Sequence, residues 1–285
     1  MRFAVGLQYL LPHHALSRVV YSATRWTWRP WKDFLIRKII RNYNVDMSEA
    51  LQPEPAAYPS FNAFFTRALN AGARTAAPEA DAILCPADGR ISQAGAIRDG
   101  RIFQAKGFDF SAAELLGDDA AAAPYMNGHF VTVYLSPRDY HRVHAPLAGT
   151  LRETVHIPGR IFSVAPFTVA AVPRLFARNE RVICHFDGDR ADPGRGSYAL
   201  AMVGAMLVSG VQTVWGGVEI PPYAGAITRK DYRGRNIRLD RFAELGRFNM
   251  GSTVILLLPA GAAELASGLQ ADAPVRVGQS LGRLI

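Results

Sequence analysis

From about residue 80 onward, hydrophobic positions come in short runs rich in β-branched side chains, with turn residues between them. Such runs are typical of β-strands, and stretches with the three-to-four-residue spacing of helices are few here. Turn signals such as Asp187-Gly188-Asp189 separate the runs. The pattern predicts a predominantly β body, with strands at 131–135, 181–186, 199–208, 212–220 and 253–258.

Two segments of this body, 144–151 and 275–282, look like the turn-strand units of barrel-sandwich modules that carry lipoyl or biotin groups. Neither segment contains a lysine that could carry such a group. The likeness therefore supports strands joined by turns in the body and indicates nothing about function.

The N-terminal region has a different pattern, which combines basic, aromatic and aliphatic residues. Residues 1–50 hold eight basic and three acidic side chains, and they include three of the four tryptophans, Trp26, Trp28 and Trp31. The stretch 52–55, Gln-Pro-Glu-Pro, then indicates a linker. We expect an α+β protein, with a helical, membrane-associating region at 1–75 and a β-rich domain at 76–285 that carries any catalytic site.

Tryptophan and cations beside an aliphatic face are typical of a helix lying in the membrane interface. An amphipathic helix packed on its own domain is the alternative. No apolar run reaches the roughly 18 to 20 residues that cross a bilayer, and the first 15 residues lack a signal-peptide layout. The pattern predicts a peripheral, monotopic protein on the anionic cytoplasmic face of the cell (inner) membrane.

Composition narrows the choice of partners. The 285 residues carry a net charge of +8, and 49% of them are hydrophobic, which is ample for a core. Because the charge gathers around the tryptophans, we expect an anionic membrane and no nucleic acid as the partner. Cys85 and Cys184 lie far apart and outside a Cys-x-x-Cys spacing, which indicates buried thiols in a reducing compartment.

A hydroxyl nucleophile stands at the start of the last predicted strand, where Gly251-Ser252 precedes the apolar run 254–259. The Ser252 γ-oxygen could attack the carbonyl of Gly251, because glycine offers no side chain to hinder the approach and tolerates strained backbone angles. A glycine and a hydroxyl that merely open a strand are the alternative.

Two further segments supply ionisable groups. The segment 134–146 contains His141, His144, a carboxylate and two guanidinium groups after an apolar strand, and Asp88 lies on a tight turn within 85–91. Each segment alone has a structural explanation as a turn or a packing residue. Together they offer a nucleophile, a base and a group to orient the base.

At these residues the chain resembles the bacterial phosphatidylserine decarboxylases, pyruvoyl-dependent enzymes of the prokaryotic type I. The family pattern most often has Leu before Gly-Ser-Thr, where this chain has Met250; the two side chains are similar in volume, so processing should survive. The resemblance covers nearly the whole chain, through segments 45–47, 60–67, 86–89, 104–107, 134–146, 176–184, 214–215 and from 246 onward.

The resemblance implies self-cleavage between Gly251 and Ser252, which would give a β chain of residues 1–251 and an α chain of residues 252–285. Ser252 would act as the nucleophile, His144 as its base, and Asp88 would orient His144, as in a serine-protease triad. Ser252 would then become a covalent pyruvoyl group, which serves as the cofactor; no metal is implied.

The implied reaction converts phosphatidylserine to phosphatidylethanolamine and CO2 through a Schiff base to the pyruvoyl group. His141 is a candidate to deliver the proton to the substrate or to orient its carboxylate. Arg138 and Arg142 could bind phosphate or carboxylate, or could pair with acidic residues in the turn. We also expect a homo-oligomer, with a dimer as the expected form.

Three other functions compete with this prediction. A β-rich zinc hydrolase would use His141 and His144 with Asp139 or Asp88 as ligands, although it would give Ser252 no role. A basic module that binds nucleic acid or lipid without chemistry would rest on charge alone. A pyruvoyl enzyme acting on a soluble amino acid would leave the basic aromatic N-terminus unexplained.

Overall fold

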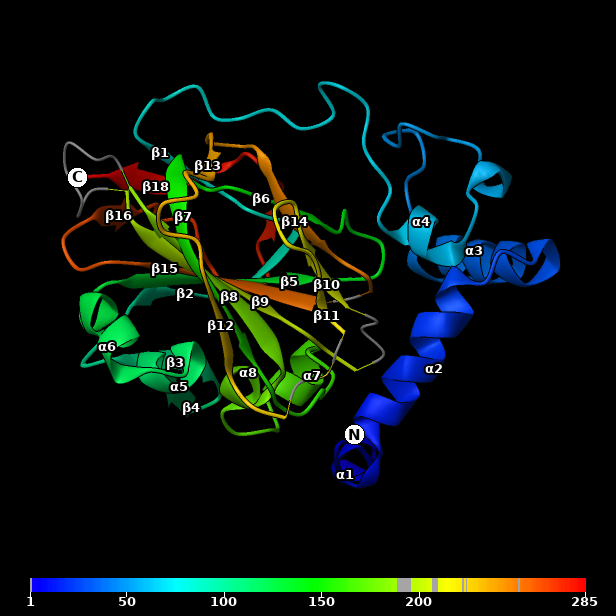
Figure 1. Ribbon diagram of the computed structural model, residues 1–285, viewed down its shortest axis with the longest axis horizontal. Helices are drawn as coiled ribbons and strands as arrows, with labels where there is room; N and C mark the ends of the chain where they lie inside the picture. Colours follow the sequence, from blue (N-terminus) through cyan, green and yellow to red (C-terminus); the bar gives the residue numbers. More distant parts are fainter. Residues whose placement is uncertain (1, 189–195, 207–209, 222, 224, 251) are drawn as a thin grey trace.

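The computed structural model describes residues 2–188, 196–206, 210–221, 223, 225–250 and 252–285, which form the predicted α+β fold with a mostly β body (Figure 1). The main sheet is antiparallel throughout, and its nine described strands follow the order β12-β7-β8-β9-β15-β5-β2-β17, with β13 beside β7. These strands are β2 (Gly89–Ala96), β5 (His129–Leu135), β7 (Gly149–Ile157), β8 (Arg181–Asp187), β9 (Tyr198–Val203), β12 (Thr228–Asp231), β13 (Arg238–Leu239), β15 (Ser252–Leu258) and β17 (Pro274–Val275).

The strand β15 lies in the interior of the main sheet and is buried along its whole length. It pairs with β5 on one side and with β9 on the other. Its side chains alternate between two cores: Val254, Leu256 and Leu258 belong to one hydrophobic cluster, whereas Ile255 and Leu257 belong to another. A strand buried on both faces explains why its sequence is a continuous apolar run, and the strand predicted at 253–258 is confirmed.

Two smaller sheets complete the first of these cores. Ile83, Leu281, Val143 and Phe248 come from these sheets and join the cluster that contains Val254. Their orders are β1-β18-β16 and β11-β10-β14-β6. The strands are β1 (Ala82–Leu84), β16 (Ala263–Leu265), β18 (Ser280–Leu284), β6 (Arg142–His144), β10 (Val211–Thr213), β11 (Gly217–Ile220) and β14 (Glu244–Phe248).

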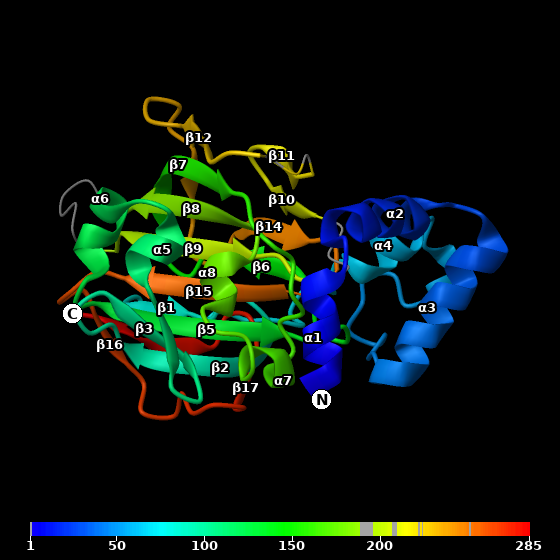
Figure 2. The same cartoon turned by 90° about the horizontal axis from the view of Figure 1, so that it is seen from below.

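Short helices and a hairpin cover the other core. Figure 1 shows them beneath the main sheet, and in Figure 2, seen from below, they lie in front of it. Leu115, Val169 and Phe176 of the helices and Phe110 of the hairpin pack in the cluster that contains Ile255. These elements are β3 (Arg101–Ala105), β4 (Phe108–Ser111), α5 (Ala112–Leu116), α6 (Asp119–Ala122), η2 (Ala123–Tyr125), α7 (Pro166–Val169) and α8 (Leu175–Arg178).

Two predicted strands differ from the observed ones. The run 212–220 is a hairpin of two antiparallel strands, β10 and β11, because the chain turns at 214–216 and Gly217 adopts a φ of +68°. The run predicted at 199–208 forms β9, which ends at Val203; positions 207 and 208 lie outside the described residues.

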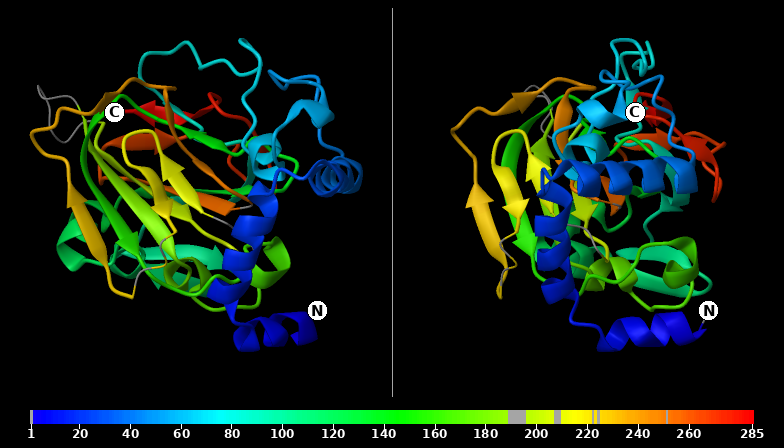
Figure 3. Two further views of the ribbon diagram at one scale, coloured as in Figure 1. Left: turned by 45° about the vertical axis from the view of Figure 1, so that its right-hand side comes forward. Right: turned by 90° about the vertical axis from the view of Figure 1, so that its right-hand side faces the viewer.

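The N-terminal region is helical and lies beside the β body (Figures 1 and 3). Its elements are α1 (Arg2–Leu10), α2 (His13–Arg25), α3 (Arg29–Tyr43), η1 (Pro55–Ala57) and α4 (Phe61–Phe65). Ile36 of α3 and Phe61, Phe64 and Phe65 of α4 share a separate small core with Tyr58. Among the described residues, no helix combines the length and apolar character needed to cross a bilayer. The domain boundary at 75/76 stays a prediction.

The first two helices also contact the β body directly. The His13 Nδ1 atom accepts a hydrogen bond from the backbone N–H of Ile161 at 3.2 Å, and the His14 Nε2 atom lies 3.0 Å from the carbonyl oxygen of Gly159. The ring of Tyr9 packs on Phe162 with centroids 4.9 Å apart. Part of the N-terminal region therefore packs on its own domain, as the alternative interpretation expected.

Candidate active site

Ser252 is the first residue of β15 and lies opposite Leu135, the last residue of β5. Its side chain is fully buried, and its Oγ atom has no hydrogen-bond partner within the described part of the chain. A buried hydroxyl without a partner is costly, so such an atom is a candidate for chemistry. Gly251, the expected site of attack, lies outside the described residues.

The chain that leads to Ser252 is held by two backbone hydrogen bonds just before a strained residue. The backbone N–H of Phe248 donates to the carbonyl of His141 at 3.0 Å, and that of Asn249 donates to the carbonyl of Gly210 at 2.8 Å. Met250 follows with a φ of +98°, a region that side chains with a Cβ rarely adopt. Strain of this kind costs about 1–3 kcal/mol and is common at functional sites.

His141 lies at the end of the loop that follows β5. Its Nδ1 atom is 2.8 Å from the carbonyl oxygen of Asp139, and because a carbonyl only accepts, Nδ1 carries the proton. Its Nε2 atom is buried and has no partner among the residues described. Burial lowers the pKa of His141 to about 3, so the ring is neutral and presents a free lone pair at Nε2.

Phe65 of α4 supports the His141 ring, with the two ring centroids 4.0 Å apart. The helix α4 begins at an N-cap, Ser60, whose side chain accepts a hydrogen bond from the backbone of Ala63. The N-terminal region therefore supplies one wall of the site around His141.

His144 ends β6 and is held at both ring nitrogens. Its Nδ1 atom donates to the carbonyl of Phe242 at 2.7 Å, which leaves Nε2 as the basic atom. The Tyr140 hydroxyl lies 3.2 Å from Nε2. Burial raises the pKa of Tyr140 to about 12, so this hydroxyl keeps its proton and donates it to His144. Burial also lowers the pKa of His144 below its usual value, so the ring is a neutral base near pH 7.

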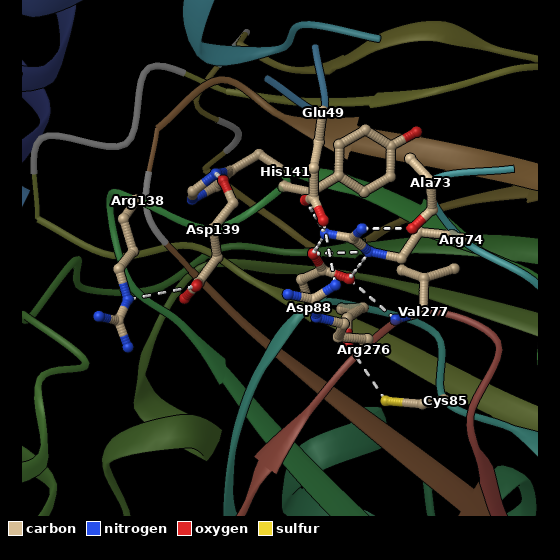
Figure 4. A network of polar contacts seen from close by, with 12 residues as sticks. Glu49, Ala73, Arg74, Cys85, Asp88, Arg138, Asp139, His141, Arg276 and Val277 are labelled. Atoms are coloured by element: carbon tan, nitrogen blue, oxygen red, sulfur yellow. Dashed lines mark hydrogen bonds and ion pairs between the residues drawn. The ribbon is translucent and has the colours of Figure 1, made fainter. Parts of the chain in front are cut away.

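Asp88 is buried on the turn before β2, where Arg74 holds it (Figure 4). The Nε atom of Arg74 donates to Oδ1 at 2.9 Å and to Oδ2 at 3.0 Å, and the backbone N–H of Val277 donates to Oδ1 at 2.9 Å. Arg74 also forms an ion pair with Glu49 at 2.9 Å, and Glu49 pairs with Arg276 at 3.0 Å.

The expected hydrogen bond from the His144 ring to Asp88 is not among the contacts of the described residues. The carboxylate is engaged by Arg74 and Val277, and the His144 proton is directed at Phe242. The two residues still belong to one region, because the backbone N–H of His144 donates to the carbonyl of Pro86 at 2.8 Å. In this conformation a backbone carbonyl, and not Asp88, fixes the tautomer of His144.

The two arginines of the 134–146 segment have different surroundings. Arg142 pairs with Glu244 at 2.8 Å, and its Nε atom donates to the carbonyl of Thr66 at 3.1 Å, so it links β6, β14 and the end of α4. Arg138 is half exposed and lies 3.7 Å from Asp139. Arg142 therefore has a structural role, and pairing within the turn accounts for part of the surroundings of Arg138.

Sequence reasoning missed three groups that hold this site: Arg74, Tyr140 and the carbonyl of Phe242. Tyr140 lies inside the segment that contains both histidines, so its position in the sequence could have indicated that it belongs to the site. Arg74 lies in a region without a motif, and the Phe242 contact is made by the backbone, which no side-chain pattern reveals.

A zinc site is not supported. Within the described ranges, no group of three His, Cys, Asp or Glu side chains could hold a metal ion. His141 and His144 both direct Nδ1 at backbone carbonyls. The cysteines are buried, and burial raises the pKa of Cys85 to about 12 and that of Cys184 well above its usual value, so neither is a reactive thiolate.

Known proteins resemble this chain over its full length. The phosphatidylserine decarboxylase family model matches residues 61–283, and a second model, described as PSD, matches residues 3–44. The chain is 60% identical over 287 residues to a protein of Xanthomonas campestris pv. campestris (strain B100), with 99% of each covered. It is 61% identical over 286 residues to one of Xanthomonas euvesicatoria pv. vesicatoria (strain 85-10), again with 99% of each covered.

A protein of Xylella fastidiosa (strain M12) is 58% identical over 281 residues, which cover 99% of this chain and 94% of that protein. All three relatives bear the name phosphatidylserine decarboxylase proenzyme. A family model over most of the chain and relatives near 60% identity agree with the buried serine at the start of β15. The chain belongs to the phosphatidylserine decarboxylase family.

Proposed function

We propose that this protein decarboxylates phosphatidylserine to phosphatidylethanolamine and that it makes a pyruvoyl group from its own Ser252. The observation that carries the proposal is the buried Ser252 hydroxyl, which has no partner among the described residues and follows the strained Met250. The name proenzyme, borne by the relatives, fits a precursor that is processed.

The self-cleavage step needs a base for Ser252, and we assign this role to His144. Its Nε2 lone pair is fixed in place by the Nδ1 bond to Phe242, and its lowered pKa keeps it unprotonated at neutral pH. To accept the Ser252 proton, His144 must exchange its contact with the Tyr140 hydroxyl for one with the serine.

Self-cleavage begins at the Ser252 hydroxyl. The Oγ atom attacks the preceding carbonyl and gives up its proton to the base, and the amide C–N bond breaks as its nitrogen gains a proton, which leaves an ester. Loss of the Ser252 α-proton then expels the carboxylate of residue 251. Water hydrolyses the resulting dehydroalanine and releases ammonia, and the new carbonyl remains at position 252.

The residues around position 252 fit the pyruvoyl group, since its precursor is a fully buried hydroxyl that lies opposite Leu135 of β5 and has no partner among the described residues. The group supplies a carbonyl that takes up the electron pair left by departing CO2. We assign the later proton delivery to the substrate to His141, whose Nε2 atom has no partner among the described residues and must first take up a proton, because the ring as described is neutral and carries its proton on Nδ1. Orientation of the substrate carboxylate is the other role that His141 could take.

Intact mass spectrometry of the purified protein tests the proposal. We expect two chains, residues 1–251 and a 34-residue fragment, 252–285, which begins in a ketone that reacts with hydroxylamine. The Ser252→Ala variant should remain one chain without activity. If the wild-type chain stayed uncleaved and still decarboxylated phosphatidylserine, the claim that Ser252 gives rise to the catalytic carbonyl would be refuted.

We further propose that the N-terminal helices rest on the anionic cytoplasmic face of the inner membrane. Trp26 and Trp28 are 54% and 55% exposed, and Phe34 is 52% exposed. Arg25 lies over the ring of Tyr21, and Lys38 lies over that of Phe34. Exposed aromatic rings with nearby cations suit a lipid headgroup layer.

Vesicle sedimentation tests the membrane proposal. The Trp26→Ala/Trp28→Ala variant should bind vesicles of anionic phosphatidylglycerol about tenfold more weakly than the wild type. The loss of each indole ring reduces the apolar area that the protein can bury in the membrane. A matched variant on the β body, Val218→Ala, should bind normally. Equal binding by all three proteins would contradict the proposal. The expected homo-oligomer remains a prediction for sedimentation velocity.

A further inference from the structure

Arg67 is a buried cation whose donors are mostly unused. The residue is 4% exposed and follows α4. Its Nη2 atom donates to the carbonyl of Arg138 at 3.0 Å, and its guanidinium lies 5.4 Å from the centroid of the Phe64 ring. Its Nε and Nη1 atoms are buried and have no partner among the described residues. Buried N–H donors are normally satisfied, so this guanidinium is unusual in the fold.

The buried Arg181 shows how this fold satisfies a guanidinium that only serves structure. Its Nε, Nη1 and Nη2 atoms donate to the carbonyls of Leu115, Asn179 and Glu114 at 2.7, 2.8 and 2.6 Å. Arg67 has one such bond, and within the described ranges it forms no ion pair. A ligand that reaches these buried atoms could therefore supply the partners that they lack.

Arg67 lines a cavity of about 310 Å³, together with residues 138–140 of the segment that carries His141 and His144. Asp88 and Tyr140 also line it, and the Tyr140 hydroxyl contacts His144. Phe65, two residues before Arg67, packs on the ring of His141. A ligand group bound by Arg67 would thus be anchored beside the residues assigned to catalysis.

The carboxylates on the cavity wall form no ion pair with Arg67 among the described contacts, because each has a closer partner. Asp88 and Glu49 bind Arg74. Asp139 accepts a hydrogen bond from the backbone of Ser136 at 2.6 Å. Asp46, the remaining carboxylate on the wall, accepts from Ser48 at 2.7 and 2.9 Å.

A planar guanidinium with free N–H groups suits an anion that offers two oxygen atoms, as carboxylates and phosphates do. The substrate of the proposed reaction has both kinds of group. Its carboxylate leaves as neutral CO2, so a cation bound to it would stabilise the ground state more than the transition state and slow the reaction. Its phosphodiester keeps its charge throughout, so a cation can bind it without this cost.

We propose that Arg67 is the receptor for the phosphodiester of the substrate headgroup. This inference rests on the proposed function, because it takes phosphatidylserine as the substrate. It assigns Arg67 to binding and leaves self-cleavage to the groups around Ser252. The Arg138 guanidinium, half exposed on the same cavity wall, is the second cation within reach of such an anion.

The test uses processed enzyme and two soluble competitors of the decarboxylation assay. Glycerophosphoethanolamine carries the phosphodiester without a carboxylate, and serine carries the carboxylate without a phosphate. In Arg67→Gln we expect full cleavage, a KM for phosphatidylserine raised about tenfold or more with kcat nearly unchanged, and inhibition by glycerophosphoethanolamine weakened to a similar extent. Inhibition by serine should stay unchanged.

The variant Arg283→Gln is the matched control, because it removes an exposed arginine paired with Glu264 far along the chain. It should behave as the wild type. Arg67→Lys keeps the charge and should retain part of the phosphodiester affinity; it decides the matter if Arg67→Gln does not fold. If Arg67→Lys had unchanged inhibition constants, the proposal would be overturned, because the several N–H groups of the guanidinium would then have no part in binding the phosphodiester.

Three results with Arg67→Gln would overturn the inference: unchanged inhibition by both competitors, weakened inhibition by serine alone, or failure of self-cleavage. The first would make Arg67 a structural residue, the second a carboxylate receptor, and the third a part of the processing machinery. Failure of the proposed function would look different, since the wild-type chain itself would then show no cleavage.

Discussion

Arg74 binds Asp88 through both carboxylate oxygens, with its Nε atom 2.9 Å from Oδ1 and 3.0 Å from Oδ2. Asp88 is the residue expected to orient His144, yet its partner in this conformation is a cation from the segment between α4 and β1. Glu49 binds the same guanidinium, so one arginine joins the N-terminal region to the β body. If Asp88 acts on His144 during self-cleavage, the contact with Arg74 must first rearrange.

The substitution Arg74→Gln should destabilise the precursor, because it leaves Asp88 buried without a counter-charge. Removal of one partner of a buried ion pair typically costs about 3–5 kcal/mol. The free energy of unfolding should be measured by urea denaturation in the Ser252→Ala background, which keeps the chain in one piece. The double variant Arg74→Gln/Asp88→Asn should recover part of the loss, whereas additive losses would show that the pair is not coupled.

The two histidines should separate self-cleavage from decarboxylation. His144→Ala should slow cleavage at least about a hundredfold, because it removes the proposed base for Ser252. His141→Ala should cleave and then decarboxylate poorly. Time-resolved intact mass spectrometry followed by a CO2 release assay measures both steps.

Tyr140→Phe is the control for the histidine pair, because it removes only the hydroxyl that contacts His144. It should cleave at a rate within about tenfold of the wild type, given the modest net worth of one hydrogen bond. If both histidine variants lost cleavage equally, both histidines would be needed for self-cleavage, and the separation of their roles would be wrong.

Stability should fall as the pH is lowered, because His141 and His185 are buried as neutral rings with pKa values lowered to about 3. In the unfolded chain they protonate near pH 6.5, whereas in the fold they stay neutral until about pH 3. Their contribution to the free energy of unfolding is therefore complete above pH 6.5 and is lost as the pH falls toward 3. Each should contribute a slope of about 1.4 kcal/mol per pH unit in that window.

Urea denaturation of the Ser252→Ala precursor at several pH values checks this slope. Both ring nitrogens of His185 are buried and have no partner among the described residues, so His185→Leu should fold. In this variant, the free energy of unfolding should change less steeply with pH than in the parent, by about 1.4 kcal/mol per pH unit, which is the contribution of one proton. An unchanged slope would mean that His185 already protonates in the native state.

Met250→Gly should relieve backbone strain next to the cleavage site. Glycine accepts the φ of +98° that Met250 adopts. If this strain speeds self-cleavage, the variant should cleave about tenfold more slowly, since strain of this kind is worth about 1–3 kcal/mol. Met250→Leu, which places a side chain of similar volume there and keeps the strain, should cleave at the wild-type rate. Faster cleavage in the glycine variant would show that the strain opposes the reaction.

The sequence predicted the body well where burial is continuous. The run 253–258 could only be a core element, because five of its six side chains alternate between two apolar clusters. The short helices α5 to α8 escaped prediction, since elements of four or five residues are too short to display a helical period. The 212–220 hairpin was predicted as one strand although Gly216-Gly217 marks its turn, because apolar residues flank this pair on both sides.

At the site, sequence reasoning identified side chains but not their partners. Asp88, His141, His144 and Ser252 lie in recognisable segments, and the structure places each of them in a buried or half-buried setting. The carbonyl that holds His144 comes from a residue 98 positions away, and no composition or spacing specifies such a contact. Unused donors, such as those of Arg67, become visible only when every other contact is known.

The position of β15 determines the fate of the enzyme after self-cleavage. The 34-residue fragment would begin inside the main sheet, between β5 and β9, and would also supply β16 and β18 of a smaller sheet. Its departure would require both sheets to come apart. We therefore expect the nicked enzyme to retain its carbonyl for as long as it stays folded, and thermal inactivation to be irreversible, because a separated fragment cannot regain its place once the precursor chain is gone.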